Sequence, residues 1–202
     1  MLKLIGFYDY TVILTYLSLI SSVLGMVLAH RGSFMWAVVC LMVSGVCDAF
    51  DGTVARSKKN RTEDEKAFGI QLDSLCDVVC FGVFPAYLCH CIGIRSIAGI
   101  LLLCGYCVCA VIRLAFFNVL EAKRQKVEEG SNKVYRGLPV TSAAILFPLV
   151  LSLRRFLPPV LFAVLLHILP VVTAFLFILD IPVKKPSLKF TAARKKRSER
   201  SR

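Results

Sequence analysis

Long apolar stretches separated by short polar segments dominate the chain. Each stretch approaches the roughly 20 apolar residues that a helix needs to cross the hydrocarbon core of a bilayer. The pattern predicts an all-α integral membrane protein with six transmembrane helices, of which the fifth is the shortest. The six stretches lie at residues 11–30, 34–50, 72–94, 97–119, 140–153 and 160–179.

Composition agrees with this apolar pattern. Hydrophobic residues make up 57% of the 202 residues and charged residues only 19%, whereas soluble domains are usually about 45–50% apolar. The charge is concentrated in the connecting segments and at the C-terminal end. We therefore expect a six-helix transmembrane domain at residues 1–183 and a basic cytoplasmic tail at residues 184–202.

The basic residues predict the orientation, because Lys and Arg accumulate on the cytoplasmic side of membrane proteins. With a cytoplasmic N-terminus, 20 of the 25 basic residues fall on that side, four fall on the other, and Arg113 lies within a span. We expect a multi-pass protein of the cell (cytoplasmic) membrane with both termini in the cytoplasm. The same distribution explains the formal net charge of +12 without a nucleic-acid partner, and we expect none.

Four aspartates stand out because acids are rare in membrane spans, where uncompensated charge is expensive. Asp48 and Asp51 close the second apolar stretch, and Asp73 and Asp77 open the third, which predicts both pairs at one cytoplasmic edge. Spacings of three and four residues place each pair on one helix face. Converging carboxylates suit Mg²⁺ or Mn²⁺, and two such ions can serve phosphoryl transfer. We expect two divalent cations here; the alternative is that the acids only cap helices.

The residues around these acids follow a longer pattern. Asp48-Ala-Phe-Asp51-Gly52-Thr-Val-Ala55-Arg56 and Gly69-Ile-Gln-Leu-Asp73-Ser-Leu-Cys-Asp77 resemble the signature D-x2-D-G-x2-A-R, a gap, and G-x3-D-x3-D of the CDP-alcohol phosphatidyltransferases. All eight fixed positions match. The gap, residues 57–68, is longer than usual, and its polar residues would fit in a cytoplasmic loop. The resemblance implies that family's six-helix fold, usually homodimeric, with a polar cavity open to the cytoplasm.

The resemblance also implies roles by position. The four acids match the metal-binding positions, and the last of them, Asp77, matches the family's proposed catalytic base. An alcohol would attack the phosphate linked to diacylglycerol, and CMP would leave. The positions near the CDP moiety are matched by Asp48, Gly52, Ala55, Arg56 and Gly69.

Two further segments resemble the serine branch of the family, as found in membrane-type bacterial members. Arg113-Leu-Ala-Phe-Phe-Asn118 is similar to its R-L-A-R-F-N run, with Phe116 in place of the second Arg, and Tyr135-Arg136-Gly137-Leu138-Pro139 is similar to its F-x-G-L-P motif. The resemblance implies CDP-diacylglycerol and L-serine as partners, beside membrane lipid. The candidates to bind serine or phosphate are Arg113, Asn118 and Arg136.

Several alternatives stay open. As a charge inside a span, Arg113 needs an anionic partner, which could be a ligand or a structural aspartate. The same fold could use glycerol 3-phosphate or an inositol phosphate, although such acceptors call for a larger cluster of cations. A cation channel or transporter would spread its acids along a path at mid-depth, whereas these acids gather at one edge.

Overall fold

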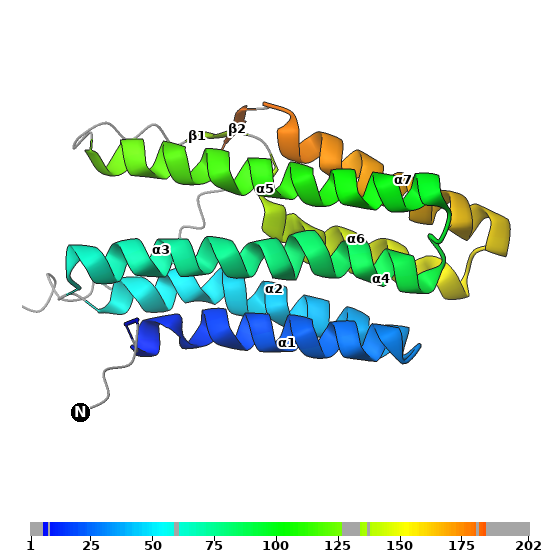
Figure 1. Ribbon diagram of the computed structural model, residues 1–202, viewed down its shortest axis with the longest axis horizontal. Helices are drawn as coiled ribbons and strands as arrows, with labels where there is room; N and C mark the ends of the chain where they lie inside the picture. The colour runs from blue at the N-terminus through cyan, green and yellow to red at the C-terminus, as the bar shows by residue number, and fades with distance from the viewer. Residues whose placement is uncertain are drawn as a thin grey trace, which may run out of the picture.

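The structure of the protein is a computed structural model that describes residues 6–7, 9–58, 61–126, 134–136, 138–180 and 182–184. Its helices lie roughly side by side along one long axis (Figure 1). The π-helix η2 continues α3 into α4, and the other short η elements are 3-10 turns. The elements are η1 Tyr10–Val12, α1 Ile13–His30, α2 Phe34–Ser57, α3 Glu63–Asp77, η2 Val78–Val83, α4 Phe84–Ile92, α5 Ile97–Lys126, β1 Val134–Arg136, η3 Val140–Ser142, α6 Ala143–Ser152, η4 Leu153–Arg155, α7 Pro159–Ile178 and β2 Pro182–Lys184.

Five helical segments are long and apolar enough to cross a membrane. Large apolar side chains stay exposed along their outer faces, as Ile20, Leu24 and Val27 do on α1. Contiguous apolar surface of this kind needs a cover, and lipid supplies it for a membrane helix. The prediction of a helical multi-pass membrane protein is therefore confirmed. The five segments are Tyr10–His30, Phe34–Ala55, Glu63–Ile92, Ile97–Leu120 and Pro159–Ile178.

The predicted fifth span, at residues 140–153, is shorter than the others. Its central helix α6 has 10 residues, which is about 15 Å of helix, with 3-10 turns on both sides. Pro148 inside α6 cannot donate to the helical hydrogen-bond ladder. α6 packs closely on α2, where a β-carbon at Gly45 would collide with Ala144. In the described part of the chain, five helices rather than six reach the length of a span.

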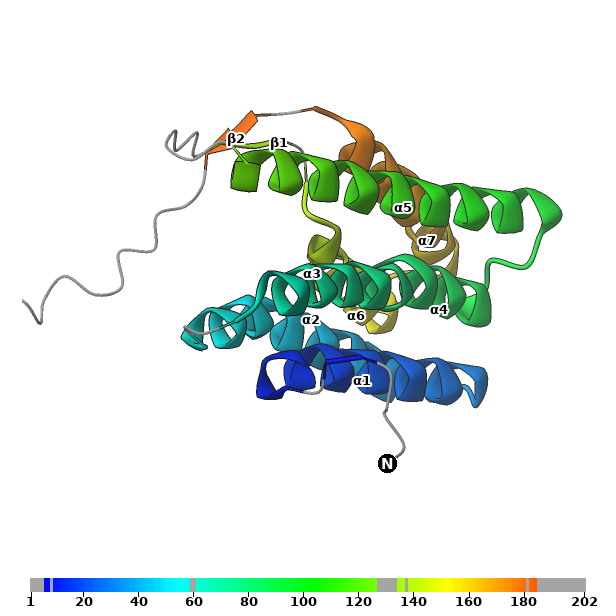
Figure 2. The ribbon, with the colours of Figure 1, turned by 60° about the vertical axis from the view of Figure 1, so that its left-hand side comes forward.

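The continuous rod from Glu63 to Ile92 forms the centre of the bundle. It lies between α1 and α2 on one side and α5 and α7 on the other, as Figures 1 and 2 both show. In the most apolar stretch of the rod 56% of the residues are buried, whereas in the most apolar stretch of α2 17% are buried. More than half of the side chains in the apolar part of this rod therefore lie inside the protein, and two of the four aspartates belong to the rod.

The two helices that carry the acids extend farther than predicted. α2 continues to Ser57 and α3 already begins at Glu63. A capping box fixes that start, since the Thr62 hydroxyl accepts from the Glu65 amide at 3.2 Å and the Glu65 carboxylate accepts from the Thr62 amide at 2.9 Å. The predicted loop at residues 57–68 is thus wrong from residue 63 onward. All four acids therefore lie within continuous helices, and Asp73 comes about three turns after the cap.

The rod changes to a π-helix directly after Asp77. Such a segment shifts the backbone hydrogen bonds from i+4 to i+5, and it often marks a functional site. The buried Tyr106 hydroxyl on α5 donates to the Phe81 carbonyl at 2.6 Å, and the Cys107 thiol lies 3.6 Å from the Gly82 carbonyl. α5 thereby stabilises the π-helix that follows Asp77.

Tyr106→Phe removes only that hydroxyl and is expected to lower the free energy of unfolding by about 1–2 kcal/mol, because the Phe81 carbonyl is left buried without its donor. Thermal unfolding of the purified protein in detergent measures the effect. Tyr87→Phe is the matched control, because its hydroxyl makes an exposed contact with His30 at 3.2 Å. Equal transitions for the two variants would contradict a stabilising role for Tyr106.

Candidate functional site

Three of the four predicted aspartates come together between α2 and the central rod. Ligand oxygens of Asp48, Asp73 and Asp77 all lie within 4.8 Å of one another. Asp77 is buried, with 8% of its surface exposed, and the other two are half-buried. Three carboxylates this close repel one another strongly in a low-dielectric interior. The arrangement therefore calls for a positive counter-charge.

The chemistry of this cluster fits a divalent cation. All its donors are carboxylate oxygens, which are the ligands that Mg²⁺ and Mn²⁺ prefer. Oδ1 of Asp73 is buried and accepts no hydrogen bond from any residue that the structure describes. A buried acceptor without a donor is unfavourable, and a cation bound among the carboxylates would satisfy it. Helix capping does not explain Asp73 or Asp77, because Thr62 caps α3.

Asp51 lies beside this cluster rather than in it. It follows Asp48 by one turn on α2, and its Oδ2 accepts a hydrogen bond from Thr15 on α1 at 3.4 Å. Asp51 and Asp73 both line a cavity of about 140 Å³. Asp51 thus lies next to the cluster of three and shares the wall of the cavity with Asp73.

Small residues form much of that wall. Gly52, Ala55 and Gly69, which the resemblance places near the CDP moiety, all line this cavity. Their small size lets a ligand approach the helix backbone closely. A larger cavity of about 530 Å³ lies at the opposite end of the bundle, beside Trp36 and Arg154. No acid lines it, so we place the functional site at the smaller cavity.

The structure adds two cations that the sequence analysis did not single out. Arg61 and Lys66 line the same cavity as Asp51 and Asp73. Both belong to the segment that was predicted as a loop, and the Thr62 and Glu65 cap would have placed them at the start of a helix. Arg56, named from the sequence, belongs to α2, but its side chain lies outside the described residues.

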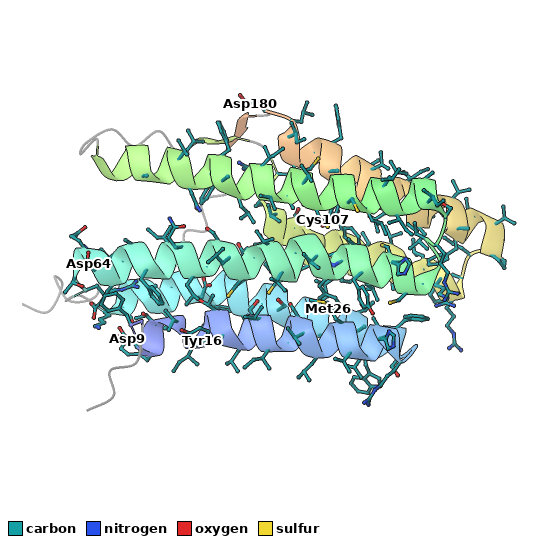
Figure 3. The ribbon with its side chains drawn as sticks, viewed as in Figure 1. Asp9, Tyr16, Met26, Asp64, Cys107 and Asp180 are labelled. Carbon is teal, nitrogen blue, oxygen red and sulfur yellow. The ribbon has the colours of Figure 1, made fainter. Side chains whose placement is uncertain are left out.

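Lys58 holds this end of the bundle together. Its Nζ lies 2.7 Å from Asp9 Oδ2 and 3.3 Å from Glu65 Oε1. The hydrogen bond from Lys58 lowers the pKa of the Asp9 carboxyl, and the same bond raises the pKa of Lys58. The contacts tie the segment before η1 to the connection between α2 and α3. Asp9 and Asp64, labelled in Figure 3, mark this end.

Arg113 lies on the other side of the rod. It is buried, its Nε donates to the Leu138 carbonyl at 3.0 Å, and its guanidinium lies 6.0 Å from the centre of the Phe117 ring. It lines a separate cavity of about 240 Å³ together with Asp180. The guanidinium therefore holds α5 to the segment before η3, and an aspartate lies at the same cavity.

The other two candidates for serine or phosphate are placed differently. Asn118 bonds with Ser74 on the rod, where Asn118 Nδ2 donates to Ser74 Oγ at 2.8 Å and Ser74 Oγ donates to Asn118 Oδ1 at 3.0 Å. This contact links α5 to the residue next to Asp73. Arg136 lies in β1, which pairs antiparallel with β2, but its side chain lies outside the described residues.

Comparison with known proteins bears on this site. Residues 10–181 match the CDP-alcohol phosphatidyltransferase family. The chain is 37% identical over 114 residues to a CDP-diacylglycerol–serine O-phosphatidyltransferase of Saccharomyces cerevisiae. The alignment covers 55% of this chain and 40% of the relative. It is 33% identical over 148 residues to an archaetidylserine synthase of Methanothermobacter thermautotrophicus. That alignment covers 71% of this chain and 58% of the relative.

A bacterial relative has the same name as the yeast relative. The chain is 36% identical over 89 residues to a CDP-diacylglycerol–serine O-phosphatidyltransferase of Bacillus subtilis, covering 43% of this chain and 48% of the relative. The chain thus spans about half the length of these relatives. The matched residues 10–181 include all four aspartates and the cavity beside them.

Proposed function

This chain belongs to the CDP-alcohol phosphatidyltransferase family, and on that premise we propose that it transfers the phosphatidyl group of CDP-diacylglycerol to the hydroxyl of L-serine and releases CMP. The observation that carries the transferase is the cluster of Asp48, Asp73 and Asp77 within 4.8 Å, beside a cavity lined by small residues. The choice of serine is supported by the relatives, several of which are named for that acceptor.

The donor would bind with its diacylglycerol among the membrane lipids and its CDP group in the cavity beside the acids. Asp48, Asp51, Asp73 and Asp77 would hold two divalent cations, Mg²⁺ or Mn²⁺. Bound there, these ions would supply positive charge that offsets the diphosphate and stabilises the attacking and leaving oxygens. Gly52, Ala55 and Gly69 leave room for the nucleotide, and Arg56 is proposed to lie near it.

Asp77 is proposed as the base. It takes the hydroxyl proton of serine while the serine oxygen attacks the phosphorus of the phosphate linked to diacylglycerol. The bond from that phosphorus to the oxygen shared with CMP breaks, and CMP leaves with the bonding electron pair. Burial of Asp77 limits competing access by water. The proposed contacts of the acceptor remain Arg113, Asn118 and Arg136. Asn118 is hydrogen-bonded to Ser74 and would reach the acceptor together with it.

The proposed arrangement in the membrane follows the charge. Both termini, the acids and the segment with Lys58 and Arg61 would face the cytoplasm at the cell membrane. The elements η3, α6 and η4 would complete a sixth span of the catalytic domain, residues 1–183. Within the basic tail, residues 185–202 lie outside the described residues. Two copies are proposed to form a homodimer.

The alternatives have less support. Glycerol 3-phosphate or an inositol phosphate would bring an additional phosphate to the acceptor side and would call for a larger cluster of cations than Arg113 and Arg136 supply. A channel or transporter would need acids along a path, whereas Asp48, Asp73 and Asp77 meet at one place.

The test is a comparison of acceptors. The purified chain in detergent micelles with CDP-diacylglycerol and Mg²⁺ or Mn²⁺ is expected to release CMP with L-serine, and to release little with glycerol 3-phosphate, inositol phosphate or no acceptor. CMP and the lipid product are both measured. Release with glycerol 3-phosphate but not serine would overturn the serine assignment, and no release with any acceptor would overturn the transferase.

A further inference from the structure

Arg61 occupies a distinctive place at the cavity wall. Its guanidinium Nη2 donates to the backbone carbonyl of Glu65 at 3.0 Å. This bond fixes the side chain against the first turn of α3. Its Nε is buried and has no hydrogen-bond acceptor among the residues that the structure describes. A buried donor without an acceptor is unfavourable, so an acceptor brought by a ligand would be stabilised here.

Gly69 makes this position possible. A β-carbon at residue 69 would lie 2.7 Å from Arg61 Nη2 and 3.8 Å from Arg61 Cζ, and Arg61 is the only described residue outside this stretch of helix that it would meet within 4 Å. The guanidinium therefore rests directly on the glycine. This contact brings a cation from the α2–α3 connection to the backbone of the helix that carries Asp73 and Asp77.

The other cations described at this end are already paired with acids. Lys58 contacts Asp9 and Glu65, and Lys66 Nζ lies 2.7 Å from Glu63. Arg61 forms no ion pair with any residue of known placement. Its charge is thus available at a cavity that Asp51 and Asp73 also line.

We propose that Arg61 binds the diphosphate of the CDP-activated substrate, an inference that rests on the proposed function. A guanidinium is always charged and presents several N–H donors in a planar fork that matches phosphate oxygens. The diphosphate, held at the carboxylate cluster by divalent cations, would extend along the cavity to Arg61. Arg61 acts in this scheme as a binding residue for the donor, and Gly69 provides the space for its side chain.

The positions of the two arginines Arg61 and Arg113 indicate that Arg61 binds the donor rather than the acceptor. Arg61 shares its cavity with Gly52, Ala55 and Gly69, the positions proposed for the CDP moiety. Arg113 lies at a different cavity, formed by α5 and the end of α7. The acids therefore have one arginine on the donor side and another on the side proposed for serine.

The experiment measures CDP binding by titration calorimetry in the presence of Mg²⁺, together with KM for CDP-diacylglycerol and for serine. Arg61→Ala is expected to weaken CDP binding about tenfold to hundredfold, as the loss of charged hydrogen bonds does. KM for CDP-diacylglycerol is expected to rise in parallel, with KM for serine unchanged. Arg61→Lys keeps the charge but not the fork, and is expected to recover only part of the affinity.

Arg95→Ala is the control for the loss of one positive charge, because Arg95 is exposed in the connection between α4 and α5. It is expected to bind CDP like the unaltered protein. Unchanged CDP binding in Arg61→Ala, with the unaltered protein active, would overturn the role of Arg61 alone. An unaltered protein that neither binds CDP nor releases CMP would overturn the proposed function as well. If Arg61→Ala does not fold, full affinity in Arg61→Lys would overturn the proposal.

Discussion

Asp77→Asn is expected to reduce turnover by about two to four orders of magnitude while leaving CDP-diacylglycerol binding largely intact. A positioned general base contributes a factor of about this size, and an asparagine amide cannot accept the serine proton. The substitution keeps the shape of the side chain, so the close packing around this buried position is retained. Asp48 and Asp73, within 4.8 Å of Asp77, remain to hold the cations.

Asp64→Asn is the matched control for that experiment. It makes the same chemical change on the same helix, but Asp64, labelled in Figure 3, is exposed in the first turn of α3. Nine residues, about 13 Å of helix, separate it from Asp73. Turnover with serine and binding of CDP-diacylglycerol are measured on both variants. Normal turnover in Asp77→Asn would remove Asp77 as the base. Loss of binding together with turnover would make its main role the holding of the cations and the donor.

Divalent cations are expected to raise the thermal stability of the unaltered protein and to have little effect on Asp73→Asn. A ligand that binds only the folded state stabilises it by about 2.7 kcal/mol at a concentration one hundred times its dissociation constant. Asp73 supplies a buried oxygen that has no donor among the described residues, so its loss should weaken cation binding strongly. Removal of the cations by a chelator is expected to abolish CMP release from the unaltered protein.

Asp73→Asn is also expected to change the stability of the protein when no divalent cation is present. Without divalent cations, Asp73→Asn is expected to be more stable than the unaltered protein, because one of three repelling carboxylates has been neutralised. Unfolding temperatures with chelator and with Mn²⁺ are compared for Asp73→Asn, Asp64→Asn and the unaltered protein. Asp64→Asn should keep the full response to Mn²⁺. An equal response in Asp73→Asn would contradict the assignment of the cluster as the cation site.

The apolar stretches predicted most of the bundle because a membrane helix is largely determined by local composition. Five of the six predicted segments correspond to helices that are long enough to span. The exception is the predicted fifth span, residues 140–153, where the α-helix α6 has 10 residues and is flanked by 3-10 turns. The start of α3 was missed although the capping pair of Thr62 and Glu65 was visible in the sequence, because the charged residues around it were interpreted as a loop.

The acids show where local pattern ends. Their spacing predicted two pairs, each on one helix face, and the structure brings one acid of α2 together with both acids of the rod. Asp51 is turned toward Thr15 and the cavity. Which side chain points into a shared site depends on how two helices are rotated against each other, and spacing within one helix does not specify that rotation.

Taken alone, the sequence determined that this protein is a helical membrane protein and singled out its four aspartates as the candidates for its chemistry. Both follow from strong local energies, the burial of apolar residues in lipid and the high cost of charge there. Only the tertiary structure decided the partners of individual polar groups, such as Arg61 over Gly69, Asn118 with Ser74, and Tyr106 with the Phe81 carbonyl. These contacts depend on the packing of separate helices, in which distances of a few ångströms decide which donor meets which acceptor.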